Sequence, residues 1–211
     1  RRGQKQQQSQ ESHQQQSERQ ALGKVEQLVD MGERRQRGRE YERAREYLTQ
    51  AVQLVRGPPD LRRHPRGCLL FGAAVGGLID VDDGLRLSGE SCLSVVERRQ
   101  ALREVLEALE GGRAIAETQD ASADELCHLH TSRAQAAGFL AESLEDAEPA
   151  SVDEAAAAAG QAVASWEAAG RYELTSQEQE DASRAPEPDV DLLSSLASAC
   201  MVHGRLLLRQ A

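Results

Sequence analysis

Cys127, His128 and His130 are the residues whose types and spacing come nearest to a metal site in this sequence. On a helix, Cys127 and His130 share a face because they lie three residues apart, whereas His128 points away from them. Zinc sites usually combine two ligand pairs, and no second pair at a comparable spacing occurs in this chain. We therefore expect these three residues to be ordinary parts of a helix.

The acidic run from Asp80 to Gly84 resembles a calcium-binding loop only in composition. Loops of the EF-hand type space their acidic ligands along the loop and place a glutamate at the twelfth position. Here the acidic residues are compressed, and the twelfth residue counted from Asp80 is Ser91. We expect a turn instead, with a carboxylate that caps the next helix.

Catalysis needs a positioned nucleophile, acid, base or phosphate cradle. The chain contains no glycine-rich phosphate loop, no nucleophilic serine motif and no HExxH zinc motif. One route to catalysis stays open, namely carboxylates that are distant in sequence and converge in the fold. We expect a protein that is not an enzyme and that binds no cofactor and no metal.

The composition indicates which elements carry these residues. Aromatic residues make up 3% of the 211 residues, whereas Ala, Leu, Glu, Gln and Arg, which all favour helices, dominate. A β-sandwich or barrel would contain far more Val, Ile, Thr and Tyr. The composition predicts an all-α fold.

Charge and hydropathy exclude two classes of partner. Residues 1–66 hold 15 basic and 9 acidic side chains and residues 67–211 hold 10 and 26, so the net charge of −10 divides into +6 and −16. Residues 67–211 are too acidic to bind nucleic acid, because the phosphates of a nucleic acid need basic side chains. The apolar run Cys68–Ile79 is about twelve residues long, well short of the ~20 that span a membrane, so we expect a buried core helix.

The stretch Leu28–Ala51 has the clearest pattern in the chain. Its apolar residues recur at steps of three and four on both sides of the polar run 34–39, which predicts two antiparallel helices. Gly38 in the turn can adopt the left-handed conformation that ends a helix. Gly32 on the first helix and Ala44 on the second would let the two helices approach closely.

Residues 25–58 resemble a tetratricopeptide (TPR) repeat, with divergence. The family pattern is W-x2-L-G-x2-Y, then A-x3-F, then P. Three positions depart from it, since Arg35 replaces an aromatic residue, Gly38 comes one residue early and Pro58 comes late. The alternative is an ordinary helical hairpin in a bundle. The residues that match the pattern, and that we expect to pack the repeat, are Leu28, Gly32, Tyr41, Ala44, Leu48 and Ala51.

This resemblance implies antiparallel helical hairpins stacked as a TPR-like α-solenoid over residues 21–170. Weaker copies would pair Gly76 with Ser88, and Gly138 with the alanines of a helix over 153–169 that ends at Gly170. We expect a Gln-rich arm at 1–20, either disordered or continuing the first helix outward, a polar linker at 171–190 and a terminal amphipathic helix at 191–211.

In the TPR family, the concave groove holds a peptide or helix of another protein. The family's clamp for C-terminal carboxylates does not carry over, since the chain has no Asn and Glu33 follows Gly32. We expect a scaffold or adaptor whose partner contacts include Glu33, Arg37 and Glu40. The second hypothesis is an accessory subunit of a multi-protein complex, anchored by its basic N-terminal arm.

Four cysteines are widely spaced along the chain and form no CxxC pair. In a chain of this length they do not form a disulfide framework, and a reduced cysteine packs as a small apolar residue. No N-terminal secretory pattern is present. We expect a reducing compartment inside the cell, in the first place the cytoplasm and alternatively an organelle.

Overall fold

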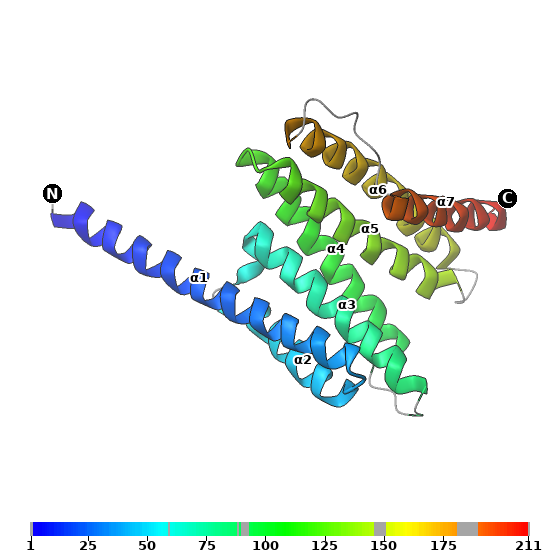
Figure 1. Cartoon of the computed structure of the whole chain (residues 1–211), viewed down its shortest axis with the longest axis horizontal. Helices are drawn as coiled ribbons and strands as arrows, with labels where there is room; N and C mark the ends of the chain where they lie inside the picture. The colour runs from blue at the N-terminus through cyan, green and yellow to red at the C-terminus, as the bar shows by residue number, and fades with distance from the viewer. Residues whose placement is uncertain are drawn as a thin grey trace. The chain divides into compact units, whose positions relative to one another are not determined.

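The computed structural model describes residues 2–58, 60–87, 89, 93–145, 151–180 and 190–210, with side chains within 15–175 and 190–210. Among these residues there is no strand, which confirms the all-α prediction (Figure 1). Contacts divide the chain into a first unit, Arg1–Cys92, and a second unit, Leu93–Ala211. The helices are α1 (Arg2–Arg37), α2 (Tyr41–Arg56), the 3-10 helix η1 (Leu61–Arg63), α3 (Pro65–Leu87), α4 (Val95–Thr118), α5 (Ala123–Glu145), α6 (Val152–Glu180) and α7 (Val190–Gln210).

The first unit is held together at Leu48, which is completely buried where α1, α2 and α3 meet. A Cβ atom added to Gly32 of α1 would lie 2.6 Å from Leu48 Cγ, and one added to Gly77 of α3 would lie 3.0 Å from Leu48 Cδ1. Each glycine therefore makes room for the same leucine. The three helices approach closely because this one side chain fills the space that the two glycines leave.

The predicted pairing of Gly32 with Ala44 needs correction. The atoms nearest to the missing Cβ of Gly32 all belong to Leu48, one turn further along α2. Ala44 is buried in a cluster with Val81 and Leu85 of α3. The reason is that three helices, and not two, converge here, so Ala44 is directed to the third helix. The other predicted packing residues, Leu28, Ala51 and the partly buried Tyr41, also lie in α1 and α2.

The expected turn at Asp80–Gly84 is wrong, because α3 continues through it to Leu87. Asp82 is buried and forms an ion pair with Arg86, one turn further along, with 3.1 Å between the two charged groups. The Cβ position of Gly84 lies 2.7 Å from the ring of Tyr41, so here too a glycine admits a large side chain of α2. The predicted repeat pairing of Gly76 with Ser88 stays a prediction. Nothing lies within 4 Å of a Cβ on Gly76, and Ser88 is outside the described residues.

The turn between α1 and α2 is built differently from the prediction. The residue with a positive φ, 58°, is Arg39, and not Gly38. Arg35 on α1 donates to both carboxylate oxygens of Glu40, at 2.8 and 2.9 Å, and so joins the last turn of α1 to the residue that precedes α2. The predicted hairpin itself is confirmed by the two helices.

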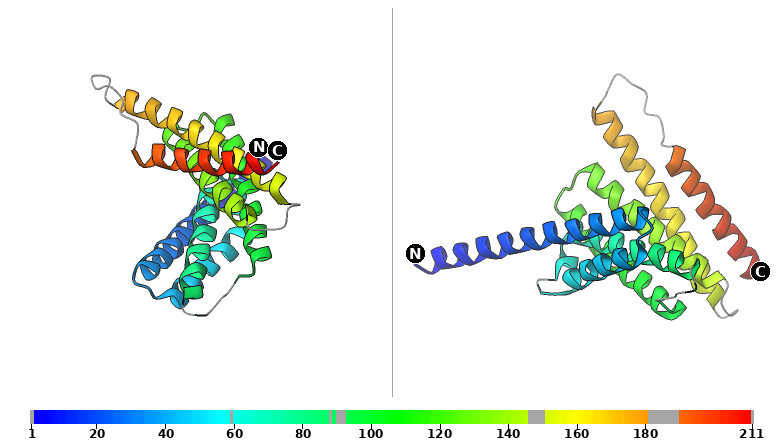
Figure 2. Two further views of the ribbon diagram at one scale, coloured as in Figure 1. Left: turned by 90° about the vertical axis from the view of Figure 1, so that its right-hand side faces the viewer. Right: turned by 60° about the horizontal axis from the view of Figure 1, so that its bottom comes forward.

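The predicted N-terminal arm is helical. α1 begins at Arg2 and continues beyond the ends of α2 and α3 (Figure 2, right). The first buried residue of its described side chains is Leu22. Of the two alternatives, the outward extension of the first helix is the one observed.

In the second unit, each helix packs mainly on the helix that precedes or follows it in the sequence. α4 begins with a capping box, in which Ser94 and Glu97 each accept a hydrogen bond from the backbone N–H of the other. The pair Gly111-Gly112 predicts the end of this helix, but α4 continues to Thr118. Two glycines cost about 1 kcal/mol each in a helix, which packing on α5 offsets.

The most extensive interface of the second unit joins α5 to α6. The missing Cβ of Gly138, expected to lie at this contact, has nothing within 4 Å, and the neighbouring Phe139 is 38% exposed. The small apolar residues that are buried on these two helices are alanines. The fully or almost fully buried ones are Ala134, Ala137 and Ala141 on α5 and Ala155, Ala159, Ala162 and Ala169 on α6.

The C-terminal elements differ from the prediction in their boundaries. α6 continues to Glu180, so the expected end at Gly170 is wrong and the first half of the expected linker is helical. Residues 181–189 lie outside the described residues. α7 lies antiparallel on α6, with Leu192 beside Gly170 and His203 beside Gly160 (Figure 2).

Candidate functional site

The sequence-predicted partner contacts lie at the turn between α1 and α2. Arg37 pairs with Glu33 on the same helix at 3.7 Å, and Glu40 accepts from both Arg35 and Arg43. The hydrogen bond from Arg35 is the main cause that lowers the pKa of Glu40. These side chains mainly neutralise one another at the surface of the hairpin.

A shallow hollow of about 230 Å³ opens beside this turn. Glu40 lines it, whereas Glu33 and Arg37 do not. Because Glu40 already receives hydrogen bonds from two arginines, it has little capacity left for a partner. The other lining residues are Met31, Arg34, Arg35 and Tyr47.

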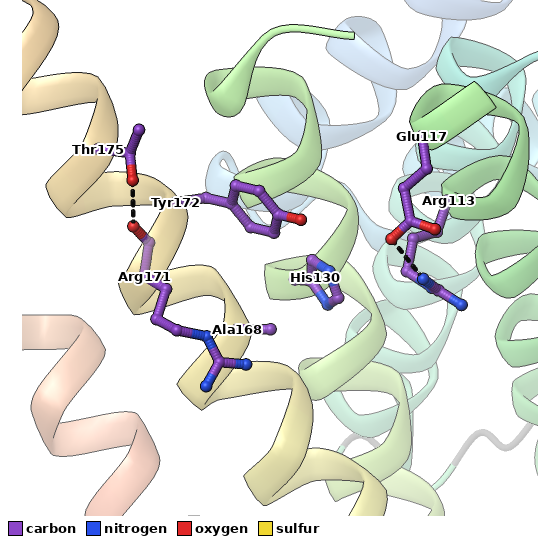
Figure 3. A pocket seen from close by; sticks show the side chains of 7 residues that line it. All are labelled: Arg113, Glu117, His130, Ala168, Arg171, Tyr172 and Thr175. Atoms are coloured by element: carbon purple, nitrogen blue, oxygen red, sulfur yellow. Dashed lines mark hydrogen bonds and ion pairs between the residues drawn. The ribbon is translucent and has the colours of Figure 1, made fainter. Parts of the chain in front are cut away.

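A larger hollow, of about 450 Å³, opens among α4, α5 and α6 of the second unit (Figure 3). Its centre is a stack of two rings, His130 from α5 and Tyr172 from α6, with centroids 5.5 Å apart and planes inclined by 19°. Arg113 and Arg171 lie on opposite sides of this stack. We call it the His130 hollow, and its remaining lining residues are Glu117, Ala168 and Thr175.

Hydrogen bonds hold the α4 side of the hollow in place. Arg113 donates to Glu110 at 2.6 Å and to Glu117 at 2.5 Å, one turn away on either side. Arg133 of α5 pairs with the same Glu110 at 3.2 Å and donates to the buried hydroxyl of Ser165 at 2.8 Å. Three helices are thus connected through one network beside the hollow.

His130 is a buried base whose Nδ1 atom has no hydrogen-bond partner. The residue is 8% exposed, and its Nδ1 atom bonds to no donor or acceptor among the described residues. Burial lowers the pKa of His130, and the positive charges of Arg113 and Arg133 lower it further. The ring is therefore neutral at neutral pH, and it has unused hydrogen-bonding capacity.

Arg171 supplies a cation on the other side of the ring stack. The Thr175 hydroxyl donates a hydrogen bond to the backbone carbonyl of Arg171 at 2.9 Å, so its proton is already used within α6. No ion pair connects the Arg171 guanidinium to any carboxylate in the described part of the chain. A guanidinium is the side chain best suited to bind a carboxylate with two parallel hydrogen bonds.

From its spacing in the sequence, His130 is considered as a possible metal ligand. In the structure it lines the hollow and stacks on Tyr172. Cys127 is half-buried, which raises the pKa of its thiol, and His128 is exposed and bonded to the carbonyl of Asp124 at 2.8 Å. No group of three potential metal ligands occurs among the residues described. Arg113, Arg171 and Tyr172 were not predicted, because they lie on separate helices and match no motif.

The comparisons with known proteins give no family for this chain. No family model, no curated protein and no solved structure matches it. Within the part of the chain that the structure describes, no helix combines the length and the apolar character needed to cross a bilayer.

The depressed pKa of His130 makes the second unit sensitive to acid. Because the unfolded chain binds a proton near the ordinary pKa of about 6.5 and the folded chain only at lower pH, stability is lost as the pH falls from that value towards the folded pKa. We expect the His130→Phe variant, which keeps a ring beside Tyr172, to lose less stability on acidification than the wild type.

Urea unfolding followed by the fluorescence of Trp166, which lies in α6, measures this directly. His128→Phe, at the exposed neighbouring histidine, is the control and should keep the wild-type dependence on pH. An equal acid sensitivity of His130→Phe and wild type would show that His130 is not buried in its neutral form.

Proposed function

We propose that this chain is a non-catalytic interaction scaffold that binds a segment of a partner protein, and that the His130 hollow receives a carboxylate of that segment. The observation that carries the proposal is the position of Arg171, which lines the hollow together with the ring of the neutral His130. Its guanidinium has no ion pair to a carboxylate of the described residues. A carboxylate bound there would accept hydrogen bonds from the guanidinium and from donors beside it.

The local charge favours one carboxylate over a strongly acidic segment. Around the hollow, Arg113, Arg133 and Arg171 face Glu110 and Glu117, so the cations exceed the anions only slightly. The rest of residues 67–211 is strongly acidic, which repels polyacidic partners. A segment with one carboxylate at the hollow and neutral or basic residues around it fits both conditions.

The arrangement of helices supports a more specific fold than all-α, namely a TPR-like stack of helical hairpins. Packing of each helix mainly on its neighbours in the sequence is typical of helical repeat proteins, which use such stacks to bind other proteins. Close contacts at Gly32 and Gly77 fit hairpins stacked at short distance. A helical bundle is the alternative for each unit.

Selection of random peptides against the full chain tests the proposal. We expect the selected peptides to share a carboxylate, as Asp, Glu or a free C-terminus, and to lose about tenfold or more in affinity when Arg171 is replaced by glutamine, since hydrogen bonds to charged groups contribute about 1.5–3 kcal/mol. The matched control is Gln161→Glu, which lowers the net charge equally at an exposed site on the same helix. Unchanged affinity for Arg171→Gln would exclude the hollow as the binding site.

The second candidate function is an accessory subunit anchored by its N-terminal arm. It rests on the extension of α1 as a helix ahead of Leu22, the first buried residue among its described side chains. Deleting residues 1–20 separates the two proposals. If the arm anchors the chain, the deletion variant no longer binds the partner. If the partner binds in the His130 hollow, the deletion variant still binds it.

A further inference from the structure

The last helix, α7, carries two apolar faces. One packs on α6, with Leu206 completely buried and Leu192 beside Gly170. The second face is exposed along the whole helix. We call it the outer stripe, and it consists of Val190, Leu193, Ala197, Cys200, Met201, Gly204, Leu207 and Leu208.

The outer stripe has the spacing of a coiled-coil seam. Six of its residues follow one another at alternating steps of three and four, which is the heptad pattern, and they extend over most of a 21-residue helix. These six are Val190, Leu193, Ala197, Cys200, Gly204 and Leu207. Five of these side chains, Val190, Leu193, Met201, Leu207 and Leu208, are among the large apolar side chains that remain exposed. A stripe of this kind on a solvated helix needs a second helix to cover it.

The sequence of the stripe is complementary to itself in the antiparallel direction. When Ala197 of one copy faces Cys200 of another, Leu193 faces Gly204 and Val190 faces Leu207, and the two-fold axis repeats each pair. Nothing lies within 4 Å of the missing Cβ of Gly204, so it offers open space for the leucine side chain. The two small residues at the centre allow the helices to approach closely.

Charge favours the same direction. Asp191 lies at the start of α7, and Arg205 and Arg209 lie near its end. Both arginines also contact Glu145 of their own chain, Arg205 at 2.9 Å and Arg209 at 3.8 Å. Antiparallel pairing places the acidic start of each helix beside the basic end of the other, whereas parallel pairing places like charges together.

We propose that the outer stripe of α7 binds the outer stripe of a second copy of this chain, antiparallel, and so forms a two-fold symmetric dimer. Its layers are Val190 on Leu207, Leu193 on Gly204 and Ala197 on Cys200. This surface is separate from the His130 hollow, so either proposal can fail without the other.

Sedimentation equilibrium of the full chain over about a hundredfold range of concentration tests the dimer, because a dimer dissociates on dilution. The wild type should approach twice its monomer mass. Leu193→Lys and Gly204→Glu should each weaken the dimer by about tenfold or more, as charge enters an apolar seam. The control is Val96→Lys at an exposed valine of α4, which should leave the wild-type mass.

The register has its own test in a mixture of the two variants. In this register the ammonium group introduced by Leu193→Lys in one chain would face the carboxylate introduced by Gly204→Glu in the other, so mixing the variants should restore the dimer. A wild type that stays monomeric at every concentration would overturn the proposal. This holds also if a different protein binds the stripe. A wild-type dimer that neither single variant weakens would place the interface elsewhere, and a mixture without recovery would exclude the antiparallel register.

Discussion

Replacing Leu48 by alanine lowers the free energy of unfolding of the first unit by about 2–5 kcal/mol, the range for a fully buried leucine. We expect the upper part of this range. Leu48 fills the space opposite two glycines on two other helices, and a glycine has no side chain that could move into the cavity. Hydrogen exchange of the α2 amides, measured by mass spectrometry, gives this free energy for the unit that contains the change.

A double-mutant cycle shows whether Leu48 and Gly32 are in contact. Gly32→Ala alone should cost about 1–3 kcal/mol, because its methyl group would lie 2.6 Å from Leu48 Cγ. In the Leu48→Ala background the same methyl group has space, so the second change should cost less than in the wild type. Additive losses would mean that the two residues do not share this space.

Replacing Gly67 by alanine should be more disruptive than Gly32→Ala and should lower the free energy of unfolding by about 3 kcal/mol or more. A Cβ at this position would lie 1.9 Å from the carbonyl oxygen of Leu61 and 2.7 Å from its carbonyl carbon. These are backbone atoms of η1, whose Leu61 side chain is itself buried, so they cannot rotate away as a side chain would. The start of α3 has to move away from η1, which exceeds the usual cost of overpacking.

The matched control for Gly67→Ala is Gly111→Ala. Gly111 lies within α4, is exposed, and a Cβ there meets nothing within 4 Å. Alanine favours the helix over glycine, so we expect a gain of about 0.5–1 kcal/mol. Thermal unfolding followed by circular dichroism distinguishes the two substitutions, because Gly67→Ala should lower the melting temperature and Gly111→Ala should raise it. A Gly67→Ala protein as stable as wild type would contradict the close approach of η1 to α3.

The positions of most helices could be predicted because apolar spacing is a local property. The hairpin of α1 and α2, the core helix at Cys68–Ile79 and the helix that carries His130 follow from that spacing. The predicted link between glycine and close packing also holds at Gly32. The partner of each glycine could not be predicted, because Leu48 contacts glycines on two helices at once.

The errors arise where tertiary contacts override local preference. Aspartate and glycine favour turns, so local propensity predicts a turn at Asp80–Gly84. In the fold, Asp82 is buried beside Arg86, and Gly84 admits the ring of Tyr41. Both contacts stabilise a helix that local propensity opposes. In the same way, Gly111 and Gly112 lie inside α4, which packs on α5.

The His130 hollow could not be predicted from the sequence. Its lining residues extend from Arg113 to Thr175 on three helices, and their spacing matches no motif. The one available signal was a histidine on a predicted apolar helix face, which is more often a core residue than a ligand. The missing hydrogen-bond partner of its Nδ1 atom becomes visible only when the neighbouring helices are in place.

Binding of a carboxylate in the His130 hollow is open to direct measurement through the pKa of His130, followed by NMR. A selected peptide is added once with a free carboxylate and once with that group converted to an amide. A bound carboxylate stabilises the imidazolium form, so we expect that only the free acid raises the pKa of His130, and that Arg171→Gln abolishes the rise. An unchanged pKa with the bound acid, or an equal rise with the amide, would contradict carboxylate binding at this site.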